Sequence, residues 1–457
     1  MKKRFHLLYA LRYFRYGLLL CLIPMVRALL AFRLDAFWAA LGQDAVILAV
    51  FAALALALWS ATGFWLTKDT IETESGFLLQ NHYAWARASL AALEVSRPLY
   101  CRLLGASRVV LYFKNYPAPA TFTLYLHKKD AAALAEDLMP VKSDASVFAP
   151  AGFERLTFAM LSANVLTSCA FVYMALHKAN DFIDQDLEAL AKENLSRLTQ
   201  LAGLWLPAGL SALAALCFLV GSITFLYAFL HTMHFSVCRN GGVLISRGGF
   251  ITKIERRIRV AAVTACEVRV TPVARLLRRY PVYVSAGSFG GGDIPVLVYK
   301  KGAEQMTQAL LPSFTAPDGP LCDPARKSPV QYLWKPGVLL ALFLGMGGVA
   351  LASMPALLPV LAVPVLLSFL CLLVSLEGMR REGLCKNANR TLSVCYTRFF
   401  TRHEVCVLTS DLSFHLFETP FAVSAGRCDV TVCLPCRRRL RVRGVLRYAV
   451  QAIPFTL

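Results

Sequence analysis

Charged residues are scarce in this sequence: Asp, Glu, Lys and Arg together make up 17% of the 457 positions, whereas hydrophobic residues make up 57%. Soluble globular domains carry about 25% charged residues. A chain this apolar has more hydrophobic side chains than a water-soluble fold of this size needs for its interior. The composition therefore disfavours an ordinary soluble protein and predicts segments that lie in a lipid bilayer.

Short motifs typical of catalytic sites are also missing, since the sequence contains no P-loop, no GxSxG nucleophile elbow and no HExxH zinc motif. The turn at residues 290–293 lies between apolar runs and is interpreted as a strand connection rather than a phosphate cradle. The clearest apolar runs contain no acidic residues, which argues against an ion-coupled transporter. We therefore expect a protein that is not an enzyme, with no catalytic residues, no cofactor and no metal site.

Acidic residues are outnumbered 28 to 48 by basic ones, which gives a formal net charge of +20. Such a charge can indicate nucleic-acid binding, but in a membrane protein basic residues gather in loops that face the anionic cytoplasmic leaflet. The apolar runs favour the second explanation, so no nucleic acid is expected as a partner. Several of the 14 cysteines lie within apolar runs, and we expect reduced thiols rather than a disulfide framework.

Six apolar runs approach or exceed the length that crosses about 30 Å of hydrocarbon. They pair into three predicted transmembrane hairpins, residues 17–32 with 45–66, 158–176 with 201–230, and 336–352 with 356–376. The segment 178–199 carries more acidic than basic side chains, whereas basic residues flank the runs on the other side. By the positive-inside rule, we expect a multi-pass protein of the cell membrane with both termini in the cytoplasm.

Three long polar segments follow these hairpins and resemble one another. In the first two, a Gly-Phe pair, a Glu-Val pair and an Arg-Leu-Leu triplet recur 173 positions apart. These landmarks are Gly76-Phe77 and Gly249-Phe250, Glu94-Val95 and Glu267-Val268, and Arg102-Leu103-Leu104 and Arg275-Leu276-Leu277. The third segment is a weaker copy at a shift of 149, where Phe399, Thr401, Arg402 and Glu404 align but the glycine and the triplet are missing. Repeats at a fixed spacing predict repeated structural modules.

Within each module, alternating apolar and polar residues predict short strands that are closed by a helix. Strands are expected at residues 121–126, 282–285 and 294–299. One closing helix is expected at residues 130–139, with Asp130 as its N-cap, and its counterpart at residues 302–311. The polar segments are therefore expected to fold as small β domains.

A hairpin, a strand, Gly-Phe, a basic strand, Glu-Val near Arg-Leu-Leu, and a terminal helix together resemble the bacterial pleckstrin-homology-like (PH-like) domain of membrane-flanked proteins of the YdbS/YdbT type. Three such units resemble the longer, YdbT-like, multi-pass arrangement. The resemblance implies a partly open, orthogonally packed antiparallel sheet of about seven strands, capped by the helix. It carries over no catalytic residue. We expect Gly76 and Gly249 at turns with positive φ, Arg102 and Arg275 at the surface or as caps, and the two Leu-Leu pairs in the core.

The predicted fold is thus a membrane α+β protein with six transmembrane helices in three hairpins, each hairpin followed by a cytoplasmic PH-like β domain with a C-terminal helix. The hairpins are assigned to residues 1–66, 151–235 and 326–378. The PH-like domains are assigned to residues 67–150, 236–325 and, in divergent form, 379–457.

Basic clusters at the predicted strand-to-helix junctions of the three copies are the candidate binding site. They comprise Lys128, Lys129, Lys300, Lys301, Arg437, Arg438 and Arg439. These side chains fit contact with anionic lipid headgroups or with an acidic partner, and equally fit a soluble rim that enforces topology. Cys433 and Cys436 form a CxxC motif whose redox or metal-binding role the sequence leaves open.

The predicted function is that of a non-catalytic, membrane-anchored scaffold or binding protein that presents three PH-like domains to the cytoplasm, with membrane stress or defence as its suggested setting. Its expected partners are the bilayer and a second protein or further copies of itself. The alternative is a transporter or channel subunit whose PH-like domains are regulatory.

Overall fold

The computed structural model describes residues 4–11, 34–75, 80–114, 121–141, 146–162, 208–292, 294–300, 305–311, 314, 329–353, 358–387, 390–398, 401–418 and 420–447. The chain forms two compact units. The first comprises Met1–Lys142, Ala163–His234 and Arg247–Arg257, and the second comprises Ser143–Ser162, Phe235–Ser246 and Ile258–Leu457.

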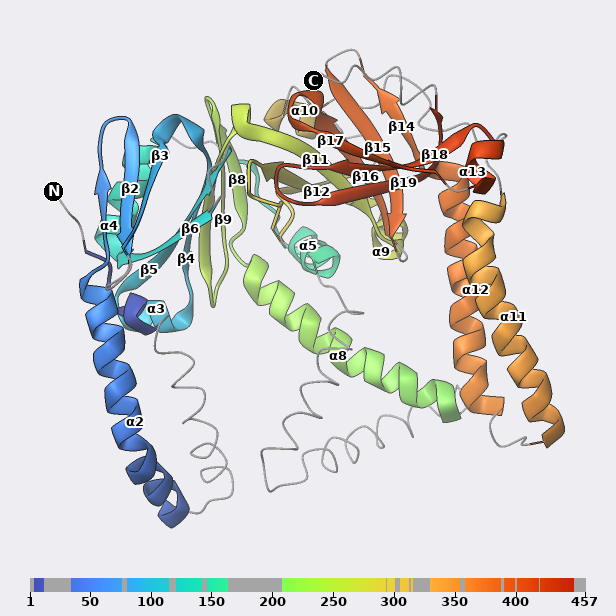
Figure 1. Ribbon diagram of the computed structural model, residues 1–457, viewed down its shortest axis with the longest axis horizontal. Helices are drawn as coiled ribbons and strands as arrows, with labels where there is room; N and C mark the ends of the chain where they lie inside the picture. The colour runs from blue at the N-terminus through green and yellow to red at the C-terminus, as the bar shows by residue number, and fades with distance from the viewer. Residues whose placement is uncertain are drawn as a thin grey trace. The chain divides into compact units, whose positions relative to one another are not determined.

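The first unit contains two three-stranded antiparallel meanders from the first repeat (Figure 1). One is β1 (Gly63–Leu66), β2 (Thr70–Ser75) and β3 (Asn81–Ala86), and the other is β4 (Leu90–Arg97), β5 (Ala106–Phe113) and β6 (Thr121–His127). Exposed and buried side chains alternate along β6, as expected of a strand with one face on the core. Trp85 of β3 stacks on Phe113 of β5 with ring centroids 5.0 Å apart, so the two meanders pack face to face.

A strand of the second repeat extends the β4-β5-β6 sheet of the first repeat. The second repeat begins with β8 (Ser236–Asn240), which is followed by the hairpin of β9 (Val243–Gly248) and β10 (Lys253–Arg259). Residues Arg247–Arg257 of this hairpin belong to the first unit. β10 is the neighbour of β4, so the sheet order in this unit is β6-β5-β4-β10. The repeats are therefore not self-contained sandwiches.

The second unit has the same arrangement, formed by strands of the second and third repeats. The strands β11 (Val263–Val270), β12 (Arg279–Ala286) and β13 (Leu297–Lys300) come from the second repeat, and β14 (Gly383–Lys386), β15 (Thr391–Arg398) and β16 (Thr401–Leu408) from the third. They form one sheet of order β13-β12-β11-β16-β15-β14. β11 and β16 are antiparallel, from Ala265 opposite Val407 to Val270 opposite Arg402. β4 with β10 and β11 with β16 are thus two examples of one junction.

The last three strands form a sheet of their own, of order β17-β18-β19. They are β17 (Ser413–Phe417), β18 (Arg427–Cys433) and β19 (Arg439–Leu446). Leu392 and Val394 of β15 share a buried core with Val430 and Val432 of β18 and Val442 of β19. The third repeat therefore has the same two-meander sandwich as the first. In the part of the chain that the structure describes, each repeat has six strands that correspond between repeats, and a further short strand, β7 (Ser146–Phe148), lies between the first two and pairs with the first strand of the second.

Short 3-10 turns mark the repeat register. They lie at Arg87–Ser89, Val260–Ala262 and Thr409–Asp411, at the same shifts of 173 and 149 as the sequence landmarks. The closing helices follow the last strand of the first two repeats as α4 (Lys128–Leu138) and α10 (Gln305–Leu310). α4 begins two residues earlier than predicted, so Asp130 lies in its first turn and is not its N-cap.

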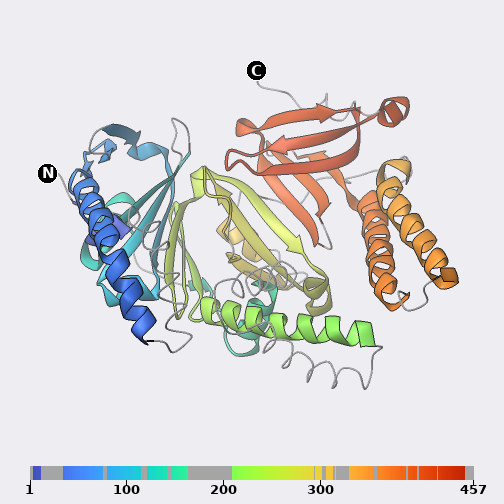
Figure 2. The same ribbon diagram turned by 60° about the horizontal axis from the view of Figure 1, so that its bottom comes forward.

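The prediction of six transmembrane helices in three hairpins is wrong. Ten α-helices are present in the described ranges, and one of them contains a segment, Tyr332–Ser353, that is long and apolar enough to cross a membrane. This segment lies in α11 (Pro329–Ser353), and α12 (Leu358–Arg381) lies beside it (Figures 1 and 2). The apolar parts of the other long helices, Ala49–Ser60 in α2 (Leu34–Ser60) and Phe218–Thr232 in α8 (Ala208–Thr232), are shorter.

Two of the predicted spans include residues that pack with the β domains instead. The run 45–66 includes β1, where Trp65 pairs with Glu72 of β2. The run 158–176 begins in α5 (Phe153–Ser162), where Phe158 is buried and its ring lies 4.7 Å from that of Phe235. Hydrophobicity does not distinguish a helix packed on protein from one packed in lipid. The first predicted span, residues 17–32, and the remainder of the third lie outside the described residues.

Candidate functional site

The recurring glutamate of each repeat pairs with a basic residue of the next repeat. In the first unit, Glu94 of β4 accepts a hydrogen bond from Nε of Arg256 in β10 at 2.7 Å. Both side chains are largely buried. The pair lies across the strand junction, so it couples sheet pairing to charge pairing.

The equivalent glutamate of the second unit is buried more completely. Glu267 of β11 is 1% exposed and binds His403 of β16 at 2.7 Å. Arg438, from the turn between β18 and β19, donates two hydrogen bonds to its carboxylate at 2.8 and 3.0 Å, and Arg269 donates one at 3.2 Å. Burial alone would raise the pKa of Glu267, but the hydrogen bonds from His403 and Arg438 outweigh it and hold the pKa well below its usual range.

The recurring arginine also reaches the following repeat, at the end of the helix that precedes it. Arg102 lies in α3 (Leu99–Leu103) and donates to the carbonyl oxygen of Phe250 at 3.1 Å. The amide of Phe250 in turn bonds Leu230 of α8 at 2.9 Å. Arg275 lies in α9 (Pro272–Leu277) and pairs with Glu377, in the last turns of α12, at 2.6 Å. Each arginine thereby links its repeat to the end of the helix that precedes the following repeat.

The recurring glycine shapes the loop that these contacts need. Gly249 has φ +95, and a Cβ at this position would lie 1.9 Å from the carbonyl oxygen of Thr252. Its amide bonds the carbonyl oxygen of Met233, beyond α8, at 2.8 Å. The predicted positive φ is therefore confirmed at Gly249. Gly76 lies outside the described residues.

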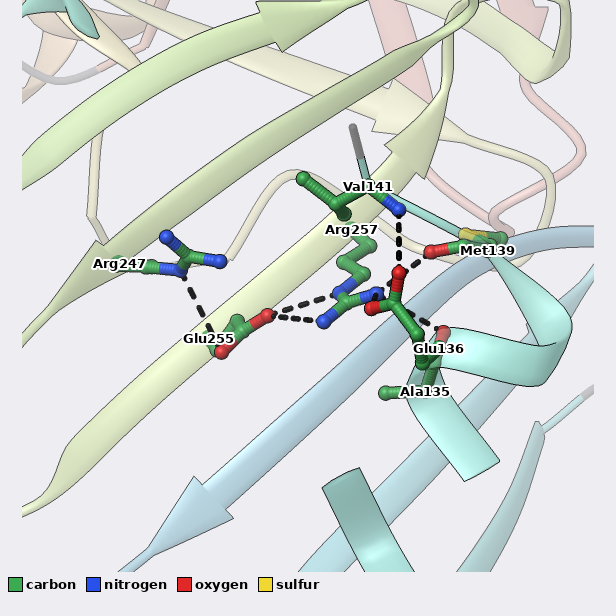
Figure 3. Close-up of polar contacts among 7 residues, drawn as sticks. All are labelled: Ala135, Glu136, Met139, Val141, Arg247, Glu255 and Arg257. Atoms are coloured by element: carbon green, nitrogen blue, oxygen red, sulfur yellow. Dashed lines mark hydrogen bonds and ion pairs between the residues drawn. The ribbon is translucent and has the colours of Figure 1, made fainter. Parts of the chain in front are cut away.

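A buried arginine next to this loop fills the C-terminal end of α4 (Figure 3). Arg257 of β10 donates to the carbonyl oxygens of Ala135 and Met139 at 3.0 and 2.6 Å and to the Glu136 carboxylate at 2.9 Å. Glu255 of the same strand accepts from its Nε at 2.8 Å. A cation here complements the helix dipole. Arg257 adds a second donor to the carbonyl oxygen of Ala135, which also accepts from the amide of Met139, and binds the carbonyl oxygen of Met139 at the C-cap. Arg257 therefore ties the second repeat to the helix of the first.

Residues at the outer ends of the array differ from this pattern. In the third repeat, 149 positions later, Leu416 corresponds to Glu267 and Ser424 corresponds to Arg275. At the shift of 173, Tyr83 of β3 stands where Arg256 stands. The recurring glutamates and arginines of the first two repeats therefore contribute contacts to the repeat that follows.

A separate pocket of about 350 Å³ in the second unit is the best candidate for ligand binding. It is lined by Val270, Arg275, Tyr280, Tyr299, Arg381, Arg402 and Glu404. Arg275 and Arg381 both pair with Glu377, at 2.6 and 3.5 Å, and Arg402 pairs with Glu404. Nε of Arg402 is buried and has no hydrogen-bond partner. Three guanidinium groups against two carboxylates leave the pocket with a net positive charge.

The basic residues predicted as the binding site lie in different elements of the two units. Lys128 and Lys129 begin α4 and Lys300 ends β13, and all three are exposed, while Lys301 lies outside the described residues. Arg437 and Arg439 are also exposed. Arg437 and Arg438 lie in the turn between β18 and β19 and Arg439 begins β19, so the prediction that they mark a strand-to-helix junction is wrong. The turn instead directs Arg438 onto Glu267.

Three of the four leucines in the Arg-Leu-Leu triplets are exposed and Leu277 is half-buried, which corrects their predicted place in the core. Leu103 is 80% exposed and Leu276 is 83% exposed, and Leu104 is also exposed. They project from α3 and α9, beside the arginines that fasten each repeat to the next. These exposed apolar side chains therefore do not contribute to the interior of the domain.

The CxxC thiols do not resemble an activated redox pair. Cys433 ends β18, and Cys436 lies in the following turn. Burial raises the pKa of the Cys436 thiol, whereas redox-active cysteines have a lowered pKa. Among the side chains that the structure describes, no three His, Cys, Asp or Glu residues gather as a metal site.

These observations define an array of small β repeats that are joined edge to edge through shared strands. Comparison with known families identifies the repeats, because the sequence profile of the bacterial PH domain matches residues 20–142 and 195–312. The two matches together cover more than half of the chain, and the protein belongs to the bacterial PH domain family. No curated protein and no solved structure matches the chain.

Proposed function

We propose that the protein is a membrane-anchored scaffold without catalytic activity, and that the pocket of Arg275, Arg381 and Arg402 binds the headgroup of an anionic phospholipid. The observation that carries the proposal is the position of Arg381. It ends α12, which packs beside the candidate membrane span Tyr332–Ser353. If this segment crosses a membrane, a pocket at the end of the helix pair would lie at the depth of the lipid phosphates.

The chemistry of the pocket suits a phosphate. Guanidinium groups donate paired hydrogen bonds to phosphate oxygens, and the buried Nε of Arg402 supplies a donor without a partner. Glu377 and Glu404 hold the arginines apart and offset part of their charge, which leaves room for one anionic group. A volume of about 350 Å³ suits a headgroup rather than acyl chains. The exposed Leu276, next to Arg275, would then contact the acyl region.

The anionic ligand also suggests an orientation. Anionic lipids are concentrated in the cytoplasmic leaflet, so the repeats would face the cytoplasm. Lys128, Lys129 and Lys300 are exposed, and each would add about 1 kcal/mol wherever it approaches that leaflet. Their role is diffuse attraction, whereas the pocket selects a headgroup. A setting in membrane stress or defence remains a prediction from the family resemblance.

Lipid retention by the full-length protein tests the proposal. Purified protein would be equilibrated with mixed anionic and zwitterionic lipids, and the bound lipids would be counted by native mass spectrometry. The double change Arg275→Gln and Arg402→Gln should lower retention of the anionic lipid by about tenfold or more, because two charge-assisted contacts are lost. Zwitterionic lipid should be unaffected.

The matched control is the pair Arg437→Gln and Arg439→Gln, which removes the same charge from exposed positions outside the pocket. Retention in the control should stay within about twofold of wild type. Equal loss in both double variants would mean that only the total charge matters, and would refute a headgroup pocket. Unchanged retention in Arg275→Gln with Arg402→Gln would refute it as well. Thermal unfolding of each variant verifies that the fold is intact.

A further inference from the structure

Two strand edges are left over by the arrangement that joins the repeats. In the first two repeats the strand after the 3-10 turn, β4 or β11, pairs with the third strand of the next repeat, β10 or β16. In the third repeat the corresponding strand is β17, which forms an outer edge of the β17-β18-β19 sheet. The third strand of the first repeat is β3, which forms an outer edge of the β1-β2-β3 sheet. Within the described ranges neither edge has a further strand beside it.

The residues on these edges are suited to being covered. Leu416 and Phe417 of β17 are 51% and 58% exposed. Exposed apolar edge strands invite pairing with another chain, and natural proteins usually protect such edges with charge or proline. β3 has the sequence Asn-His-Tyr-Ala-Trp-Ala, which contains neither Lys, Arg nor Pro. Both edges therefore lack the usual protection.

The register of the internal junction matches these two edges to each other. In the β11–β16 pair, Glu267 lies opposite Val405. The residue of the third repeat that corresponds to Glu267 is Leu416, 149 positions later. The residue that corresponds to Val405 is Arg256 in the second repeat, 149 positions earlier, and Tyr83 in the first, a further 173 positions earlier. The same pairing between β17 and β3 would therefore place Leu416 opposite Tyr83. An aromatic side chain opposite an aliphatic one is a favourable cross-strand pair.

We propose that β17 of one chain pairs antiparallel with β3 of a second copy of the chain, in the register of the β11–β16 junction. The internal junctions contain buried charge pairs, Glu94 with Arg256 and Glu267 with His403 and Arg438. The junction between chains contains an apolar pair instead. This difference keeps the strands from exchanging partners, because Leu416 in place of Glu94 would leave Arg256 without its carboxylate.

The contact joins different surfaces of the two chains, head to tail. Such an interface generates a ring if the rotation between chains closes, and a filament if it does not. Every β17 would then have the neighbour that β4 and β11 already have. The proposal is independent of lipid binding, because neither β17 nor β3 contributes a residue to the pocket.

Charge complementation between two differently tagged full-length chains tests the pairing. Leu416→Glu and Tyr83→Arg each place one unpaired charge at the junction. When two differently tagged copies of the same variant are co-expressed, co-purification of the second tag should fall at least about tenfold. A mixture of Leu416→Glu chains with Tyr83→Arg chains should recover it, because the introduced carboxylate then faces the introduced guanidinium group and the remaining junctions are wild type.

Val423→Glu is the control for a new charge on an exposed apolar position of the same repeat, away from β17. It should co-purify as wild type does. The proposal is overturned if wild-type chains do not co-purify, if Leu416→Glu behaves as Val423→Glu does, or if the mixture of the two charged variants is not restored. A photo-crosslinker at position 416 that captured β3 only within its own chain would overturn it too.

Discussion

Glu267→Gln removes the negative charge from the β11–β16 junction and keeps the shape of the side chain. Glu267 is buried among Arg438, His403 and Arg269, which would lose their shared carboxylate. Breaking a buried ion cluster by removing one partner costs about 3–5 kcal/mol. Because Arg438 and Arg269 keep partial access to water, we expect about 2–3 kcal/mol of local stability to be lost.

A native cysteine at the junction reports this loss. Cys266 precedes Glu267 in β11 and lies opposite Cys406 of β16. Cys266 is buried, and burial raises the pKa of its thiol, so it reacts slowly while the junction is closed. A loss of about 2–3 kcal/mol raises the open population about 30- to 150-fold. Alkylation of the full chain at neutral pH, followed by peptide mass spectrometry, should show a comparable acceleration at Cys266.

Glu404→Gln is the matched control, because Glu404 lies on the same junction, opposite Val268, but is partly exposed and pairs with Arg402. It should change the labelling rate less than about threefold. A wild-type rate in Glu267→Gln would refute the idea that this carboxylate holds the two repeats together. Equal acceleration in both variants would refute its specificity.

Acid should reproduce the effect in the wild-type chain. The folded pKa of Glu267 lies below its ordinary value of 4.5, so the folded state holds this proton less tightly than the unfolded state does. The stabilisation is therefore fully present above about pH 4.5 and is lost as the pH falls through the folded pKa. Hydrogen exchange of the β11 and β16 peptides should accelerate on acidification, beyond the intrinsic change, in wild type but not in Glu267→Gln.

Three further changes probe the remaining contacts. Gly249→Ala should destabilise the β9–β10 hairpin by more than about 1 kcal/mol, because a Cβ would meet Thr252 and φ is positive, and hydrogen exchange of that hairpin should increase. Arg257→Ala should cost about 2–3 kcal/mol by removing the buried donor to the carbonyl oxygens of Ala135 and Met139, which peptide-resolved exchange at α4 would measure. Tyr332→Phe removes a 2.6 Å hydrogen bond to the carbonyl oxygen of Arg443 and should lower the thermal stability of the second unit by about 1 kcal/mol.

The repeat was predictable because its landmarks keep one spacing, and the strands and closing helices follow from local periodicity. The partners of those landmarks were not predictable, because each lies in another repeat. Nothing near Glu94 in the sequence indicates Arg256, which is 162 residues away. The leucine pairs were misplaced for a related reason, since apolar identity does not tell which face of a one-turn helix the rest of the chain covers. The pocket was missed because its arginines come from three separate segments.

The shared strands also set an order for synthesis. When β4 leaves the ribosome, its neighbour β10 has not yet been made, and the Glu94–Arg256 contact spans 162 residues. At about 5–20 residues per second, the first repeat waits roughly 10–30 s with that edge open. The second repeat waits in turn for β16. Synthesis therefore includes two intervals in which a sheet edge has no partner strand. We expect chaperones to bind the nascent chain during these intervals, after the first and the second repeat are made, rather than at the end of synthesis.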